Sequence, residues 1–177
     1  MDSSDARQIV ILLILLALSA FFSSAETCLT TVNKMRIKSL ADDKNKNASL
    51  VLKLIEEKTQ MLSAILIGNN VVNLSASSLT TTFAMKLAKS SGMSDSVSAI
   101  TGIATGIITI LVLIFGEIIP KSLATMNAER LSLIYAKPIY GLTNILRPIS
   151  FLMNQLSNGL MHPVSYTHLR AHETDAD

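Results

Sequence analysis

Three long segments without a charged residue constrain this chain more than any other feature. Ile9–Phe22 holds fourteen such residues, Met61–Met85 holds twenty-five and Ser96–Phe115 holds twenty. The hydrocarbon core of a bilayer is about 30 Å thick and needs roughly 20 apolar residues of helix to cross it. Two of the segments meet that length on their own. The first is shorter, but the sequence continues to Val32 without proline or glycine, so we expect a third span there.

The composition agrees with a membrane protein. Only 16% of the residues are charged, whereas soluble globular proteins contain roughly a quarter, and the mean hydropathy is +0.44. These values argue against a soluble enzyme, and the net charge of +2 argues against a nucleic-acid-binding protein. The single cysteine, Cys28, excludes an internal disulfide and a cysteine-rich zinc cluster. We therefore predict an all-α membrane protein with three transmembrane helices and no enzymatic activity.

The chain divides into three predicted regions. Residues 1–123 form a three-span transmembrane domain, in which a basic loop at about 34–60 joins the first two spans. Residues 124–163 carry apolar residues at helical spacing, and we expect Pro138 and Pro148 to divide them into amphipathic juxtamembrane helices. A fourth span broken by these prolines is the alternative. Residues 164–177 lack an amphipathic period, which indicates a disordered tail or a segment that is not native.

The distribution of basic residues predicts the orientation. The connection between the first two spans carries seven lysines and arginines, and the next connection carries only two. The positive-inside rule places the first connection and the C-terminal region in the cytoplasm, so the N-terminus lies outside. A cleaved signal peptide is an alternative for the first segment, because Ser19-Ala20 imitates a cleavage site.

Polar residues within two of the spans suggest a binding site. Ser19 and Ser23 are four residues apart and lie on one helical face. Asn69 and Asn73 also share a face, which Ser77 extends by another turn. Amide oxygens are good ligands for hard cations, and an amide is costly to leave facing lipid. The alternative is structural, because such serines bond backbone carbonyls and such amides bond neighbouring helices.

The third span ends in the sharpest of these motifs. Pro120 has no N–H and cannot bond the carbonyl of Gly116 in a continuous helix. Glu117 is the next residue, so we predict a helix break at Pro120 that exposes a backbone oxygen beside a carboxylate. Broken helices with freed carbonyls are a common way for transporters to coordinate cations. The alternative is that Glu117 pairs with Lys121, four residues on.

These groups together form a set of oxygen donors with one formal negative charge. Such a set suits a hard cation such as Mg²⁺, Ca²⁺ or Na⁺ better than zinc or copper. Glu26 lies about one helical turn beyond Ser23. Three roles are open for it: lining a cation path, binding a coupling ion, or pairing with the basic residues of Lys34–Lys38.

Three motifs, in this order and spacing, resemble the membrane domain of the bacterial CNNM/CorC family across about residues 8–160. They are FFSSAET at 21–27, ILIGNNVVN at 65–73 and FGEIIPK at 115–121. The resemblance implies a homodimer of three-span domains with a juxtamembrane helical belt in the bacterial cytoplasmic (inner) membrane. It also implies Mg²⁺ transport, most simply Mg²⁺ export driven by Na⁺ entry.

By the same resemblance, one Mg²⁺ lies between the spans. It is held by positions matching Ser19, Ser23, Asn69 or Asn73, Gly116 and Glu117, while Glu26, Asn70 and Ser77 lie on a possible ion path. Many relatives carry serine where this chain has Ala25. Family members usually continue into paired cytosolic CBS domains that bind nucleotide, which this chain does not contain, so we expect a fragment or a truncated sequence. The alternatives to a transporter are a non-transporting membrane anchor for a cytosolic regulatory domain and a passive cation channel.

Overall fold

The computed structural model describes residues 3–90 and 97–169, and the side chains that it describes fall within 6–86 and 99–149. Within these ranges every element is helical. In chain order the elements are α1 (Ser3–Thr31), α2 (Lys34–Asp42), α3 (Lys46–Glu56), α4 (Lys58–Ser90), α5 (Val97–Leu113), the π-helical turn η2 (Ile114–Ile118), α6 (Ile119–Met126) and α7 (Ala128–Leu169). The predicted all-α fold class is therefore confirmed.

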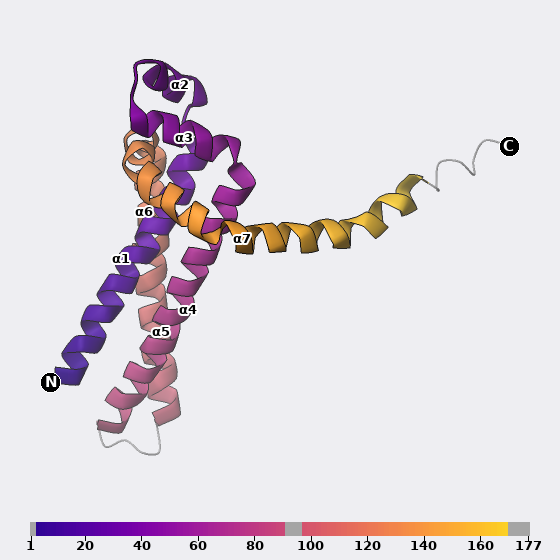
Figure 1. Ribbon diagram of the computed structural model, residues 1–177. Coiled ribbons are helices and arrows are strands. Elements are labelled where there is room, and N and C mark those ends of the chain that lie inside the picture. The colour runs from indigo at the N-terminus through magenta and orange to yellow at the C-terminus, as the bar shows by residue number, and fades with distance from the viewer. Residues whose placement is uncertain (1–2, 91–96, 170–177) are drawn as a thin grey trace.

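Three stretches of helix are long and apolar enough to cross a membrane, as predicted: Ala6–Thr31, Lys58–Lys86 and Thr101–Met126. They belong to α1, to α4 and to the continuous run of α5, η2 and α6. Figure 1 shows α1, α4 and α5 side by side, with the chain's N-terminus near one end of the bundle and α2 and α3 beyond the other. Three crossings in this order place the predicted basic loop and α7 at the same end. Which end faces the cytoplasm stays a prediction.

The predicted basic loop folds into two short helices, because an asparagine begins each of them. The Asn33 side-chain oxygen accepts hydrogen bonds from two backbone N–H groups of α2, at 2.9 and 3.2 Å. Asn45 caps α3 in the same way, at 3.0 and 3.2 Å. Asparagine is among the preferred residues at this position, because it satisfies N–H groups that have no partner within the helix. Between the two helices Lys44 adopts a left-handed conformation with φ of 65°, which turns the chain.

The hydrophobic core lies where these short helices meet the ends of the spans. α3 buries Val51 and Leu54 against residues of α1, α4 and α7, and Ile37 of α2 joins them. By contrast, only 6% of the most apolar window of the third span is buried. The most apolar part of the third span thus presents its side chains outward, as lipid or another protein surface requires.

Polar contacts join α7 to α2 and α3 at this core. Arg36 Nε of α2 lies 3.2 Å from Glu129 Oε2. Lys53 Nζ of α3 donates to the Tyr140 hydroxyl at 2.8 Å and lies 4.9 Å from the centre of its ring. This hydrogen bond raises the pKa of Lys53 and lowers the pKa of Tyr140, because it favours the ammonium and the phenolate.

The prediction that Pro138 and Pro148 divide the C-terminal region is wrong, because α7 runs through both as one helix of 42 residues. A proline inside a helix costs about 3 kcal/mol. Ala136 and Ile139, which flank Pro138, are fully buried, and this packing outweighs the lost hydrogen bond. Figure 1 shows the first part of α7 crossing the bundle and its later part extending away from it. The helix continues to Leu169, past the predicted boundary at residue 163, and residues 170–177 of the predicted tail lie outside the described residues.

A close contact between α1 and α4 gives a test of this packing. A Cβ added at Gly68 would lie 2.6 Å from Phe22 Cζ, and the Phe22 ring is buried and packed edge-on against Phe21 at 5.3 Å. We expect Gly68→Ala to lower the free energy of unfolding by about 1–3 kcal/mol, as overpacking usually does. Thermal denaturation of the purified chain in detergent measures the effect.

The matched control is Gly102→Ala, because a Cβ at Gly102 meets nothing within 4 Å. If both variants melt at the same temperature, the contact between Gly68 and Phe22 does not hold the two spans together.

Candidate metal centre

The third span passes Pro120 without breaking. In the π-helical turn η2 the N–H of Ile119 donates to the carbonyl of Ile114, five residues back, and α6 follows directly. Pro120 lies in the first turn of α6, where a missing N–H is tolerated. The predicted helix break at Pro120 is therefore wrong, because the wider π turn takes up the irregularity and the helix continues. Single π turns inside α-helices are frequent at functional sites.

Hydroxyl groups of α1 reach backbone oxygens of this irregular segment. The Gly116 carbonyl oxygen lies 3.4 Å from Ser19 Oγ, and Ser24 Oγ donates to the Pro120 carbonyl at 3.2 Å. Gly116 is needed for the first contact, since a Cβ there would lie 3.2 Å from Ser19 Oγ. A small residue in the π turn thus brings the backbone of the third span against the serines of the first.

The Ser19 hydroxyl joins all three spans at one point. Besides the Gly116 carbonyl, Ser19 Oγ contacts the Asn73 side-chain oxygen of α4 at 2.9 Å. Ser19 is only 2% exposed. The single Ser19 hydroxyl proton is therefore shared between two acceptors, the Asn73 side-chain oxygen and the Gly116 carbonyl. The three oxygens come from three helices, and the cluster has more lone pairs than hydrogen-bond donors.

A cavity of about 210 Å³ opens beside this cluster. Its lining residues include Ser19, Asn73 and Glu117, which carry hydroxyl, amide and carboxylate groups. The remaining lining residues are Ala76, Ser77, Thr80, Thr109, Val112 and Leu113. Within the described residues, no three His, Cys, Asp or Glu side chains gather to hold a metal. A ligand of this cavity would meet oxygen atoms as its polar partners.

Two further predicted site residues carry buried oxygens that have no hydrogen-bond partner. Ser23 Oγ is one of them, and the residue is 1% exposed. The other is the Asn69 side-chain oxygen. A buried polar atom without a partner costs free energy, and among the described residues Gln8, Gln60 and Thr101 carry such an atom as well. Neither residue lines the cavity, and each lies one helical turn from a residue that does, Ser19 or Asn73.

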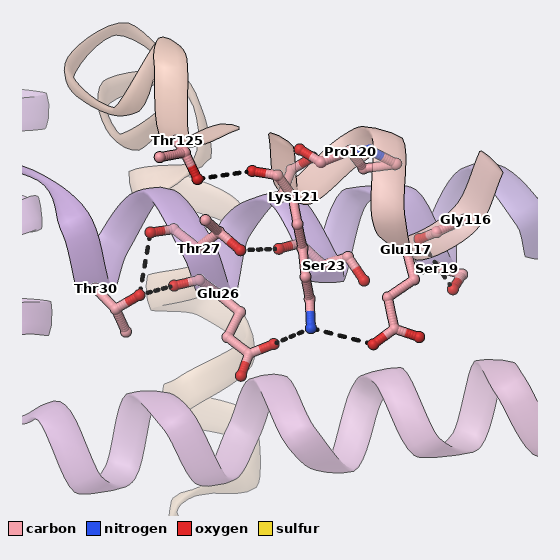
Figure 2. Close-up of polar contacts among 11 residues, drawn as sticks. Ser19, Ser23, Glu26, Thr27, Thr30, Gly116, Glu117, Pro120, Lys121 and Thr125 are labelled. Atoms are coloured by element: carbon pink, nitrogen blue, oxygen red, sulfur yellow. Dashed lines mark hydrogen bonds and ion pairs between the residues drawn. The ribbon is translucent and has the colours of Figure 1, made fainter. Parts of the chain in front are cut away.

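The Glu117 carboxylate also forms the predicted alternative contact. Lys121 Nζ lies 3.1 Å from Glu117 Oε1 and 3.6 Å from Glu26 Oε2, so the ammonium lies between carboxylates of two helices. Figure 2 shows this bridge, with Glu26 projecting from α1 and Glu117 from the third span. All three side chains are more than a third exposed.

Comparison with known proteins gives the family. A family model of the cyclin M transmembrane N-terminal domain, CNNM, matches residues 10–175. The chain belongs to the CNNM family. It is similar to the UPF0053 protein of Haemophilus influenzae, with 41% identity over 88% of the chain, and to the UPF0053 inner membrane protein YfjD of Escherichia coli, with 35% identity over 81%. A DUF21 domain-containing chloroplastic protein of Arabidopsis thaliana is 37% identical over 88% of the chain.

The CNNM chain spans about a third of the length of its bacterial relatives, 35% of the Haemophilus protein and 32% of the Escherichia protein. The family model and these relatives confirm the family resemblance drawn from the three motifs. The family match ends at residue 175 and so includes most of residues 164–177.

The CNNM fold brings some predicted site residues together and leaves others apart. Ser19, Asn73, Gly116 and Glu117 converge, and Ser77 lines the same cavity. Asn70 is exposed on α4 and is not part of the cavity lining.

Sequence reasoning missed two hydroxyls of the cavity lining. Thr80 continues the stripe of Asn73 and Ser77 by one further turn, so the helical repeat could have found it. Thr109 ends a row of three threonines in α5, Thr101, Thr105 and Thr109, spaced four residues apart, so the helical repeat could have found it too.

The neighbouring serines of α1 allow a test on the CNNM chain. Ser23 Oγ is buried without a partner, whereas Ser24 Oγ bonds the Pro120 carbonyl. We expect Ser23→Ala to leave the melting temperature unchanged or to raise it, because no hydrogen bond is lost. Ser24→Ala should cost about 1 kcal/mol, the usual net value of a hydrogen bond.

Thermal denaturation in metal-free detergent solution compares the two serine variants. Equal destabilisation by both would mean that Ser23 has a structural partner after all, and would remove it from the set of free oxygens.

Proposed function

We propose that this chain is the membrane domain of a Mg²⁺ transporter that exports Mg²⁺ in exchange for entering Na⁺. The observation that carries the proposal is the cluster around Ser19, in which a hydroxyl, an amide oxygen and a backbone carbonyl from three spans share one proton. A cation between these oxygens would accept a lone pair from each of the three, with the Ser19 hydroxyl keeping its proton and turning it away from the ion. Glu117, which faces the adjoining cavity, would offset part of its charge.

The chemistry of the cluster favours Mg²⁺ among the hard cations. Mg²⁺ takes about six oxygen ligands in octahedral geometry and gives up its waters reluctantly. Ser19, Asn73, Gly116 and Glu117 supply four of them, and the cavity of about 210 Å³ leaves room for water in the rest. Ser23 and Asn69 hold further free oxygens one turn away. Two neutral side chains, one carbonyl and one carboxylate bind less strongly than a cage of carboxylates, which suits an ion that must be released.

The family and the fold support a membrane location for this activity. The CNNM/UPF0053 family is generally linked to membrane cation transport, and the Escherichia coli relative is named an inner membrane protein. We place the chain in the bacterial inner membrane, with α2 and α3 on the cytoplasmic side because of their basic residues. A homodimer, and cytosolic CBS-type domains in the full-length protein, complete the proposal.

Alternating access accounts for the exchange. Mg²⁺ enters the Ser19 cluster from the cytoplasm, and Na⁺ arriving from outside takes up the same oxygens and displaces it. The π turn η2 and the contacts of Ser19 lie at the junction of the three spans, so a small rotation of one span separates the ligands. Release of the ion therefore requires only that the ligand oxygens of different spans move apart.

The proposal is tested by Mg²⁺ flux from proteoliposomes that contain the purified chain. Glu117→Gln removes the charge that faces the cavity and keeps the size of the side chain. We expect Na⁺-driven Mg²⁺ flux to fall at least about tenfold, because one lost charge–ligand interaction is worth more than about 1.4 kcal/mol. Glu129→Gln is the matched control, since Glu129 pairs with Arg36 outside the cavity and should leave the flux unchanged.

Other outcomes separate the competing functions. Wild-type flux that persists without Na⁺ and follows the membrane voltage would identify a passive channel. No flux, together with no change of melting temperature in Mg²⁺, would identify a membrane anchor in which Glu117 serves only its ion pair with Lys121.

A further inference from the structure

Lys121 lies where the proposed cation site meets a second carboxylate. Its ammonium is 3.1 Å from Glu117 and 3.6 Å from Glu26, and Figure 2 shows it between the two. Glu117 lines the cavity, whereas neither Lys121 nor Glu26 does. The Lys121 ammonium thus contacts the carboxylate of a residue of the cavity wall, although Lys121 itself does not line the cavity. One negative charge serves two places for a cation.

A cation in the cavity and the Lys121 ammonium cannot both interact fully with the Glu117 carboxylate. A divalent ion on the cavity side of Glu117 would repel an ammonium that lies 3.1 Å from the same carboxylate. The lysine stem is flexible, so the ammonium can move by a few ångströms without a change of backbone. Glu26 is already within reach on the other side and can keep the ammonium neutralised. A charge left unpaired near the membrane would otherwise be costly.

We propose that Lys121 is a tethered counter-cation that moves from Glu117 to Glu26 when a cation enters the cavity. This inference rests on the proposed function and names two positioning residues, Lys121 and Glu26, that act through Glu117. The ammonium neutralises Glu117 while the site is empty and withdraws when the cargo binds. Because coupling between two binding events is reciprocal, the lysine weakens cation binding, and Glu26 relieves that weakening.

We call this movement of the Lys121 ammonium from Glu117 to Glu26 the relay. It predicts opposite effects from substitutions at Lys121 and at Glu26. Lys121→Met removes the competitor and should tighten Mg²⁺ binding about tenfold, within the range typical of coupled sites. Glu26→Gln leaves the ammonium with Glu117 alone and should weaken binding by a similar factor. Binding is measured on the purified chain by isothermal titration with Mg²⁺. Lys121→Arg keeps the positive charge and should bind more weakly than Lys121→Met.

The double variant distinguishes a relay from a general electrostatic effect. If Glu26 acts through Lys121, adding Glu26→Gln to Lys121→Met changes nothing further. If Glu26 acts only through its own charge, the two effects multiply, and that result would overturn the relay. Arg36→Met is the matched control, because it removes a positive charge from an ion pair outside the cavity and should leave the affinity unchanged.

Failure of the relay and failure of the proposed function give different results. If the wild-type chain does not bind Mg²⁺ at all, the proposed function fails and the relay fails with it. If the wild-type chain binds Mg²⁺ and Lys121→Met binds it with the same affinity or more weakly, only the relay is excluded and Lys121 is a structural bridge between α1 and α6.

Discussion

The arrangement of the three spans depends on the need to pair backbone oxygens where no water is available. A bilayer core offers no hydrogen-bond donor, so an irregular turn inside a span must find its partners in neighbouring helices. Here α1 supplies them: Ser19 contacts the Gly116 carbonyl and Ser24 bonds the Pro120 carbonyl. These two serines hold the first span against the third. The position of Asn73 against Ser19 then fixes the second.

Much of the fold could be predicted from the sequence, because its causes are local. Long charge-free segments allow little except membrane-spanning helices. The family resemblance implied a common site for Ser19, Asn69 or Asn73, and Glu117, and Ser19, Asn73 and Glu117 line one cavity. Asn33 and Asn45 carry the usual signal of a helix start, and the structure uses both.

The failures have a common cause, which is packing between distant segments. Pro120 and Pro138 are breaking signals when only their own helix is considered. The π turn takes up the first, and burial of Ala136 and Ile139 outweighs the second. The bridge from Lys121 to Glu26 joins residues far apart in the sequence, and only the bundle brings them together.

The uneven distribution of the core has a mechanical consequence. Buried side chains gather at the end of the bundle that carries α2 and α3, while only 6% of the most apolar window of the third span is buried. Segments with few buried contacts open at low free energy. The three spans are therefore held together at the packed end and are less constrained at the other. The ends far from α2 and α3 can separate while the core stays intact. A small rotation of a span at the core gives a larger displacement at its far end.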